Sequence, residues 1–185
     1  MIYPLPVVMV TCGDRESIFN VITIAWTGIT CSDPPMCYIS VRPERYSYSL
    51  IDKHREFAIN LTTKDLAFAT DWCGVKSGKD VDKFKEMGLT PIPASIIKAP
   101  LIAESPVNIE CKVAQITPLG THHMFMAEIV AVHASQEHLD PKTGAFDLSK
   151  FHPICYSHGK YYVVGNRIGK FGFSVEKRKK RSHRK

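Results

Sequence analysis

The residues best suited to chemistry lie in one short segment, Arg42-Pro43-Glu44-Arg45-Tyr46-Ser47, where a strand-like run gives way to a helix-like one. A dianionic phosphate is bound well by cationic side chains, hydroxyls and free backbone N–H groups, which a helix start offers together. The loop Lys76-Ser77-Gly78-Lys79 precedes another helix-like run and could approach the same phosphate. Both segments also allow a plainer interpretation, with the arginines as surface charges and the loop as a polar turn.

Other motifs in the chain do not meet the requirements of their chemistry. The segment from Gly74 to Asp80 resembles the end of a Walker A loop, but the first glycine of that motif falls on Cys73 and Asp80 replaces the magnesium-binding Ser or Thr. The six cysteines form no Cys-x-x-Cys pair, which favours buried free thiols in a reducing compartment. His122-His123 lacks the close Cys/His partners typical of zinc, so no metal site is expected.

The net charge of +6 lies in the C-terminal tail, because residues 176–185 carry seven Lys or Arg and one acid while the other 175 residues are neutral overall. We expect this basic tail to be a disordered, solvated end. No aromatic residues interleave its charges, as a nucleic-acid stacking platform would require. The charge distribution therefore argues against nucleic acid as a partner, with loose tail contacts to anionic polymers or membranes as the alternative.

Size and composition indicate a soluble protein with one domain, expected over residues 1–175. Apolar residues make up 44% of the 185-residue chain and charged residues 23%. No apolar run approaches the ~20 residues of a membrane span. Pro4 and Pro6 interrupt the first apolar stretch, which also lacks the basic start of a signal peptide. We therefore expect a cytoplasmic protein that makes no membrane contact.

Short strands dominate the expected secondary structure. The apolar, β-branched pattern predicts strands over residues 7–11, 20–27, 36–42, 57–61, 107–116 and 125–134, and one more within 153–164. Helices are expected over 46–54, 64–73 and 80–87, the last with Asp80 as N-cap and Gly88 at C′, and turns over 28–35 and 140–144. Strands do not alternate with long helices, so the pattern predicts a mainly β fold: a small antiparallel barrel with a few short helices at its openings.

Five motifs follow one another in a recognisable order: Asn20-x-x-Thr23-x-Ala25-Trp26-Thr27, Cys31-Ser32-Asp33-Pro34-Pro35, Arg45-Tyr46-Ser47, Phe57-Ala58-Ile59-Asn60, and Gly120-Thr121-His122-His123-Met124-Phe125-Met126-Ala127-Glu128-Ile129. This order resembles the flavin reductase-like family of FMN-binding split β-barrels, which are Greek-key antiparallel barrels. The resemblance covers roughly residues 5 to 175. Thr121 and Ala127 depart from the family pattern, which has Asp and Gly at these positions.

The resemblance implies a set of FMN-binding residues. Those expected beside the isoalloxazine and ribityl chain are Thr23, Ala25, Trp26, Thr27, Cys31, Ser32, Asp33 and Pro34. Those expected at the phosphate are Arg45, Ser47 and Lys83, and Asn60 is expected at the edge of the flavin. His122 matches the family histidine on the nicotinamide or substrate side and is the expected catalytic residue. The resemblance also implies a homodimer.

We therefore expect an oxidoreductase that passes electrons from NADH or NADPH through FMN to free flavin, ferric iron or a protein. Three alternatives stay open. A flavoredoxin-like carrier would hold FMN tightly without a nicotinamide site, and a nucleic-acid-associated barrel would use the basic tail. A pyridoxal-phosphate-type oxidase would share the barrel class, although the Asp33-Pro34-Pro35 loop favours the reductase branch.

Overall fold

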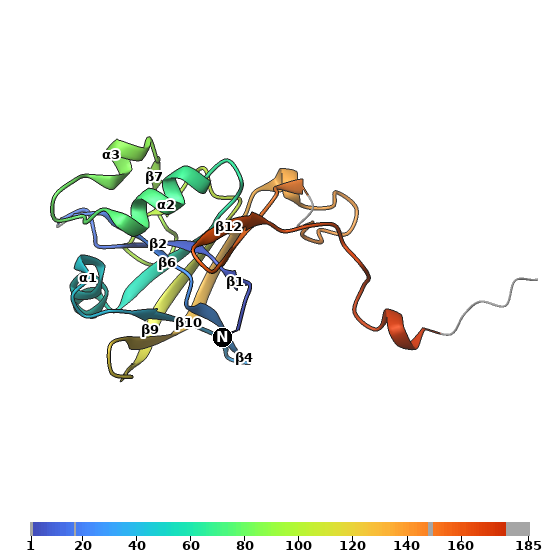
Figure 1. Cartoon of the computed structure of the whole chain (residues 1–185), viewed down its shortest axis with the longest axis horizontal. Helices are drawn as coiled ribbons and strands as arrows, with labels where there is room; N and C mark the ends of the chain where they lie inside the picture. The colour runs from blue at the N-terminus through green and yellow to red at the C-terminus, as the bar shows by residue number, and fades with distance from the viewer. Residues whose placement is uncertain (1, 17, 148–149, 177–185) are drawn as a thin grey trace, which may run out of the picture.

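The computed structural model describes residues 2–16, 18–147 and 150–176, and a seven-stranded antiparallel sheet dominates it (Figure 1). The strands of this sheet follow the spatial order β3-β2-β6-β9-β10-β5-β4. Their bounds are β2 Val8–Cys12, β3 Asn20–Ile24, β4 Thr27–Ser32, β5 Pro35–Val41, β6 Glu56–Leu61, β9 Val107–Pro118 and β10 His123–Ala134. Neighbouring strands pair antiparallel throughout.

The two edges of this sheet meet. Strands β3 and β4 stand at opposite ends of the spatial order, yet only Ala25 and Trp26 separate them in the chain. The backbone N–H of Ser40 in β5 donates to the carbonyl oxygen of Trp26 at 2.9 Å, which ties this link to the neighbouring strand. The sheet therefore closes into a barrel with a seam at Ala25–Trp26, and the predicted small antiparallel barrel is confirmed.

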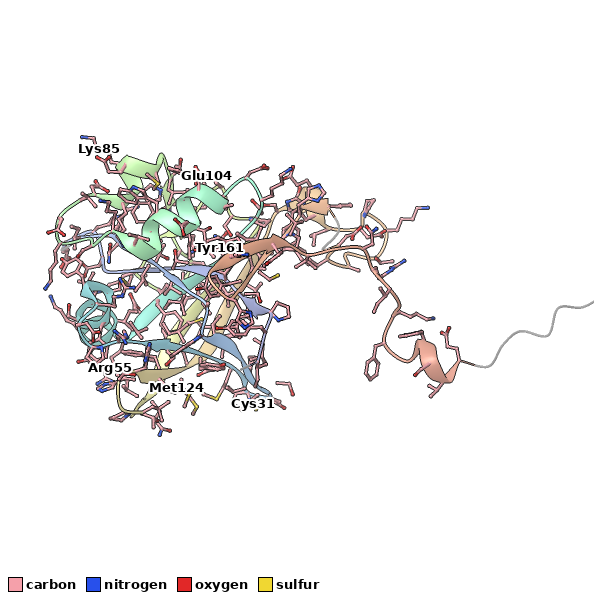
Figure 2. All side chains as sticks on the ribbon, viewed as in Figure 1. Cys31, Arg55, Lys85, Glu104, Met124 and Tyr161 are labelled. Carbon is pink, nitrogen blue, oxygen red and sulfur yellow. The ribbon has the colours of Figure 1, made fainter. Side chains whose placement is uncertain are left out.

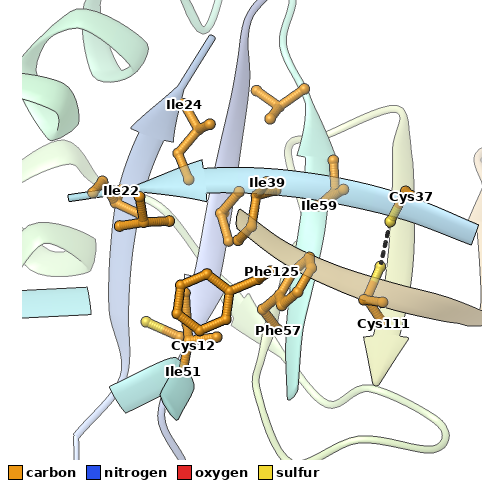
Figure 3. Packing of buried hydrophobic residues seen from close by; sticks show 14 of the residues in the cluster. Cys12, Ile22, Ile24, Cys37, Ile39, Ile51, Phe57, Ile59, Cys111 and Phe125 are labelled. Atoms are coloured by element: carbon orange, nitrogen blue, oxygen red, sulfur yellow. Dashed lines mark hydrogen bonds between the residues drawn. The ribbon is translucent and has the colours of Figure 1, made fainter. Parts of the chain in front are cut away.

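The barrel interior is filled by inward-facing side chains from β2, β3, β5, β6, β9 and β10. Phe57 and Phe125 are fully buried there, with Ile39 beside them (Figure 3). In β2 the side chains alternate: Val8 and Val10 point into the barrel, whereas Met9 packs outward under the helices. Burial on both faces explains why β2 is continuously apolar from Val8 to Val10.

Three short helices cover the barrel (Figure 1). Helix α1 (Tyr46–His54) contributes Leu50 and Ile51 to the barrel interior. Helices α2 (Ala67–Val75) and α3 (Lys83–Met87) pack outside it, where Cys73 and Phe84 contact the outward side of β2 and β3. Among the described residues, no helix is long and apolar enough to cross a membrane.

Two smaller sheets and an arm complete the described chain. Strand β1 (Leu5–Pro6) joins a hairpin of β11 (Ile154–Ser157) and β12 (Lys160–Val163), and β7 (Pro91–Ile92) pairs with β8 (Leu101–Ile102). Two single-turn helices are η1 (Gln136–His138) and η3 (Phe173–Val175). After β12 the chain leaves the body as an arm over residues 164–176 (Figure 1), on which Ile168 and Phe171 are almost completely exposed.

The structure corrects several expected boundaries. Residues 28–35 were expected to form a turn, but β4 occupies most of them, because Thr27, Ile29 and Thr30 are β-branched residues that suit a strand paired with β5. The expected strand over 20–27 is split by the barrel seam, and the expected helix over 64–73 begins at Ala67 and ends at Val75.

Two further boundaries differ near the ends of elements. The third helix begins at Lys83 because Asp82, not Asp80, is its N-cap and accepts a hydrogen bond from the N–H of Lys85 at 3.2 Å. Gly88 ends that helix with a φ of 62°, as predicted. The segment 153–164 holds two strands instead of one, because Gly159 turns the chain at a φ of 78°. The expected disorder of the basic tail falls on residues 177–185, outside the described residues.

Candidate functional site

A groove lies along the barrel seam and consists of two adjoining compartments. The aromatic compartment has a volume of about 400 Å³ and the cationic compartment about 650 Å³. Residues shared by both are Ile22, Trp26, Arg42, Arg45 and His122. The aromatic compartment is otherwise lined from β3, β5, α2 and the β11–β12 hairpin, and the cationic compartment from the start of α1, the loop 76–78 and Lys83.

Within the described residues, three cations line the cationic compartment without a carboxylate partner: Arg45, the buried Lys83 and the exposed Lys76. Lys83 is only 4% exposed, and its ammonium donates to the carbonyl oxygens of Val21 at 2.8 Å and Cys73 at 2.7 Å. Burial lowers the pKa of Lys83, and the nearby charge of Arg45 lowers it further. Within the described residues, neither Arg45 nor Lys83 takes part in an ion pair. A bound anion would relieve this uncompensated positive charge.

A polar network orients the hydroxyl of Ser47 in the same compartment. The side-chain amide of Asn20 donates to Ser47 Oγ at 2.7 Å, and the same hydroxyl is a hydrogen-bond partner of the buried Cys12 thiol. A Cβ at position 78 would lie 2.1 Å from Asn20 Oδ1, so the loop approaches β3 this closely only with Gly78. No side chain caps α1, so its first N–H groups remain available to an anion.

The aromatic compartment is open where Trp26 meets His122. Trp26 is half exposed, and its ring centroid lies 4.4 Å from that of His122. Partial burial lowers the pKa of His122, and the charge of Arg42 adds to this effect while Glu44 opposes it. His122 is therefore mainly a neutral imidazole at pH 7. The two rings are tilted by 42° relative to each other and form an aromatic wall beside the cations.

The far wall of the aromatic compartment joins helix α2 to the β11–β12 hairpin. The hydroxyl of Tyr161 donates to Asp71 Oδ1 at 3.0 Å, and Tyr156 packs edge-on against Tyr161 with ring centroids 5.6 Å apart. Burial, followed by the hydrogen bond to Asp71, raises the pKa of Tyr161 to about 12. The sequence interpretation missed this wall, and the only local pattern that could have indicated it is the pair of tyrosines flanking the turn at Gly159.

The structure brings together seven of the expected site residues: Thr23, Ala25, Trp26, Arg45, Ser47, Lys83 and His122. Thr23 accompanies Gly74 of α2, where an added Cβ would lie 3.2 Å from the Thr23 Cβ, so the helix and β3 are closely packed. The loop 76–78 also lines the cationic compartment, as the second of the two phosphate-binding segments proposed from the sequence.

The other six expected residues line neither compartment. Asn60 is fully buried behind the barrel wall, where it donates to the Met9 carbonyl at 2.9 Å and accepts from the Ile102 N–H at 3.0 Å. Thr27 is buried in β4 and donates to the Tyr38 carbonyl at 2.7 Å. The remaining four lie at the tip of the β4–β5 hairpin, largely exposed: Cys31, Ser32, Asp33 and Pro34.

Two other kinds of site find less support. A separate cavity of about 420 Å³ lies between residues 14–19 and the segment 91–100, and it contains none of the expected site residues. Within the part of the chain that the structure describes, no group of three or more His, Cys, Asp or Glu side chains is placed to hold a metal ion. All six cysteines are free thiols, four of them buried.

Comparison with known proteins shows that this closed antiparallel barrel is a split barrel. The family model described as "Flavin reductase like domain" matches residues 1–165, and the chain belongs to this family. The chain is similar to the flavoredoxin of Desulfovibrio vulgaris (Miyazaki F), with a TM-score of 0.88, 31% identity and 95% of each chain covered. It is also similar to a flavoredoxin from Methanosarcina acetivorans, with a TM-score of 0.86, 27% identity and 95% of each chain covered.

A curated relative has a more specific description. The reductase component of a 4-nitrophenol 4-monooxygenase/4-nitrocatechol 2-monooxygenase from Rhodococcus opacus is 28% identical over 117 residues. The match covers 60% of this chain and 57% of that relative. The relatives thus include both flavoredoxins and a reductase component.

Proposed function

We propose that this protein binds FMN in the seam groove and acts as an oxidoreductase that takes electrons from NADH or NADPH and passes them to free flavin, ferric iron or a protein. The observation that carries the proposal is the pair of uncompensated cations, Arg45 and Lys83, directly beside a compartment lined by aromatic rings. A phosphate and a flat ring on one ligand would satisfy both compartments.

The residues of the groove fit FMN in their chemistry. Arg45, Lys83 and the Ser47 hydroxyl would hold the phosphate, and the strand backbone near Thr23 and Trp26 would lie against the ring system. Bound FMN would supply the two-electron redox chemistry. The chain itself would bind, orient and shield the ring, and His122 at the mouth of the groove is the proposed contact for the nicotinamide or substrate.

The visible spectrum of the purified protein, with and without added FMN, tests this proposal. We expect the absorption bands of oxidised flavin to co-purify with the protein or to appear on reconstitution. Anaerobic addition of NADH or NADPH should then bleach them. A protein that neither carries flavin nor changes flavin fluorescence on mixing would refute FMN binding itself.

A second candidate is an electron carrier that holds FMN tightly and has no nicotinamide site. Similarity to the two flavoredoxins, at 31% and 27% identity over 95% of the chain, favours it. Steady-state oxidation of NADH and NADPH by the FMN-loaded protein distinguishes the two. No turnover with either nucleotide, despite bound FMN, would select the carrier.

We further propose that the protein is a cytoplasmic homodimer whose folded domain covers residues 1–175. The C-terminal arm supports the dimer, because Ile168, Phe171 and Val175 are 96%, 107% and 83% exposed on a segment that leaves the body. Apolar side chains at such exposure are typical of a surface that another chain covers. Truncation after residue 163 should therefore shift the mass measured by light scattering from dimer to monomer. An unchanged mass would remove the arm from the interface.

Nucleic-acid binding by the basic tail remains the most distant candidate. The body has no net charge to support it. Deletion of residues 176–185 decides the question, since salt-sensitive binding that survives the deletion would have to reside in the barrel.

A further inference from the structure

We propose that Asp71 and Tyr161 form a positioning pair that holds the ring end of the flavin and lowers the reduction potential of bound FMN. This inference rests on the proposed function, because it assigns a role to a wall of the aromatic compartment that is not part of the cationic compartment. The two residues stand 90 positions apart in the sequence and meet only through the fold.

The first argument is the position of the pair. Asp71 lies on α2 and Tyr161 on β12, and both line the aromatic compartment but not the cationic one. Figure 2 shows Tyr161 on the hairpin beside the helix. With a phosphate among the cations and a ring against Trp26, the opposite end of that ring would point toward this wall.

The second argument is how the hairpin is held. Strand β12 pairs only with β11, so it is the free edge of its small sheet. Among the described residues, the bond from Tyr161 to Asp71 is the hydrogen bond that joins β12 to α2. The base of the hairpin is held by the pairing of β11 with β1 and by the Ile154 N–H, which donates to the Thr62 carbonyl. The bond from Tyr161 adds the link from β12 to α2, so its loss would loosen this side of the compartment wall.

The third argument is the hydrogen-bonding character of the wall. Tyr161 uses its proton on Asp71, so the phenol oxygen and the second carboxylate oxygen can only accept hydrogen bonds from a ligand. A ring edge with an imide N–H, as in the pyrimidine portion of isoalloxazine, is the complementary donor. The high pKa of Tyr161, about 12, keeps this arrangement intact at neutral pH.

The fourth argument is electrostatic. Within the described lining of the aromatic compartment, Asp71 is the one carboxylate. Two-electron reduction of a flavin at neutral pH adds negative charge to the ring system, and a carboxylate at the ring disfavours that charge. Asp71 would therefore make the reduced flavin a stronger electron donor than it would be with a neutral residue at this position.

The experiment combines two ligands with two substitutions. Riboflavin has the ring and no phosphate, so a contact at the ring end should affect riboflavin and FMN by the same factor. We expect Asp71→Asn and Tyr161→Phe each to weaken both ligands about 10-fold in fluorescence titrations, an effect of the size of one hydrogen bond to a charged group. The exposed neighbours provide matched controls, Asp65→Asn and Tyr162→Phe, which should leave both affinities unchanged.

The reduction potential separates a positioning role from a merely structural one. Spectroelectrochemical titration of bound FMN should give a higher potential in Asp71→Asn, because the negative charge is gone. Tyr161→Phe loosens the same wall but keeps the charge, so its potential should not rise.

Two results would overturn the inference: an unchanged potential in Asp71→Asn, or a loss of FMN affinity that riboflavin does not share. Wild-type protein that binds no FMN would instead refute the proposed function, so the two failures are distinguishable.

Discussion

The barrel interior and the seam groove are built by opposite rules, although they share the same strands. The interior buries rings and aliphatic side chains around Phe57 and Phe125, and every contact there contributes to folding. The groove keeps Lys83 buried without a carboxylate and leaves Trp26 half exposed. Such an arrangement lowers the stability of the free protein, and a bound ligand would restore that stability. The difference teaches which positions should affect folding and which should affect binding.

The largest effect is expected from the interior. Phe125→Ala removes a fully buried ring and should lower the free energy of unfolding by about 3–5 kcal/mol, because the rigid barrel cannot collapse around the cavity. Chemical denaturation measures this loss. Phe171→Ala, at a fully exposed position on the arm, should change the free energy of unfolding of the monomeric protein by less than about 0.5 kcal/mol. Equal losses of unfolding free energy in Phe125→Ala and Phe171→Ala would contradict the expectation that the interior, and not the arm, stabilises the fold.

The outer wall of the barrel should make folding stability depend on pH in the acid range, through Glu110. Burial alone raises the pKa of Glu110, but hydrogen bonds from Ser95, His133 and Ile97 outweigh burial and lower it to about 2. Because the folded value lies below the ordinary 4.5, the stabilisation is fully present above pH 4.5 and is lost as the pH falls toward 2.

This stabilisation should amount to about 3 kcal/mol at neutral pH, from about 1.4 kcal/mol per pKa unit. Glu110→Gln should therefore be much less stable than the wild type at pH 7, and the difference should shrink steadily below pH 4.5. Denaturation curves between pH 2 and pH 7 measure it. Glu86→Gln, on the exposed side of α3, is the control and should follow the wild type. A constant difference across this range would contradict the assignment.

A substitution in the groove should affect binding more than stability. Arg45→Gln should weaken FMN about 10- to 100-fold, the size expected for a charge-assisted contact to phosphate. Its free energy of unfolding without ligand should change little, because Arg45 has no ion-pair partner within the described residues. Fluorescence titration with FMN measures the first quantity. If riboflavin weakens equally, Arg45 does not contact the phosphate.

The smallest effect sharpens the comparison within one helix. Ser47→Ala removes the hydroxyl that Asn20 orients toward the cationic compartment, and FMN affinity should fall about 5-fold, the value of one neutral hydrogen bond. Ser49→Ala, two residues further along α1 and exposed, should have no effect on the same titration. An equal fall in both variants would point to the helix itself rather than to the hydroxyl.

The sequence was sufficient for the features that depend on neighbouring residues. The junction of a strand with helix α1 is a local signal, and it singled out Arg45 and Ser47, which both line the cationic compartment. The short β-branched runs likewise predicted the mainly β barrel. The prediction of a turn over 28–35 was wrong. Asp33 and Pro34 suggested a longer loop, whereas pairing with β5 extends β4 to Ser32.

The features that depend on contacts between distant residues could not be predicted from the sequence. Nothing local distinguishes Asn60 as a structural residue, yet its side chain hydrogen-bonds to β2 and to the segment before β9. Asp71 and Tyr161 meet across 90 positions, so no spacing rule could pair them. Long-range pairing of this kind is fixed by the closure of the sheet and not by the residues on either side of each position.

That closure has a consequence for how the chain moves. One backbone bond, from the Ser40 N–H to the Trp26 carbonyl, holds the link between β3 and β4 against the neighbouring strand, and Ser40 itself lines the aromatic compartment. A ligand seated there would hold both sides of the bond, so local opening would require its departure. The amide proton of Ser40 should then exchange with deuterium more slowly in the loaded protein. Its protection would report whether the groove is occupied.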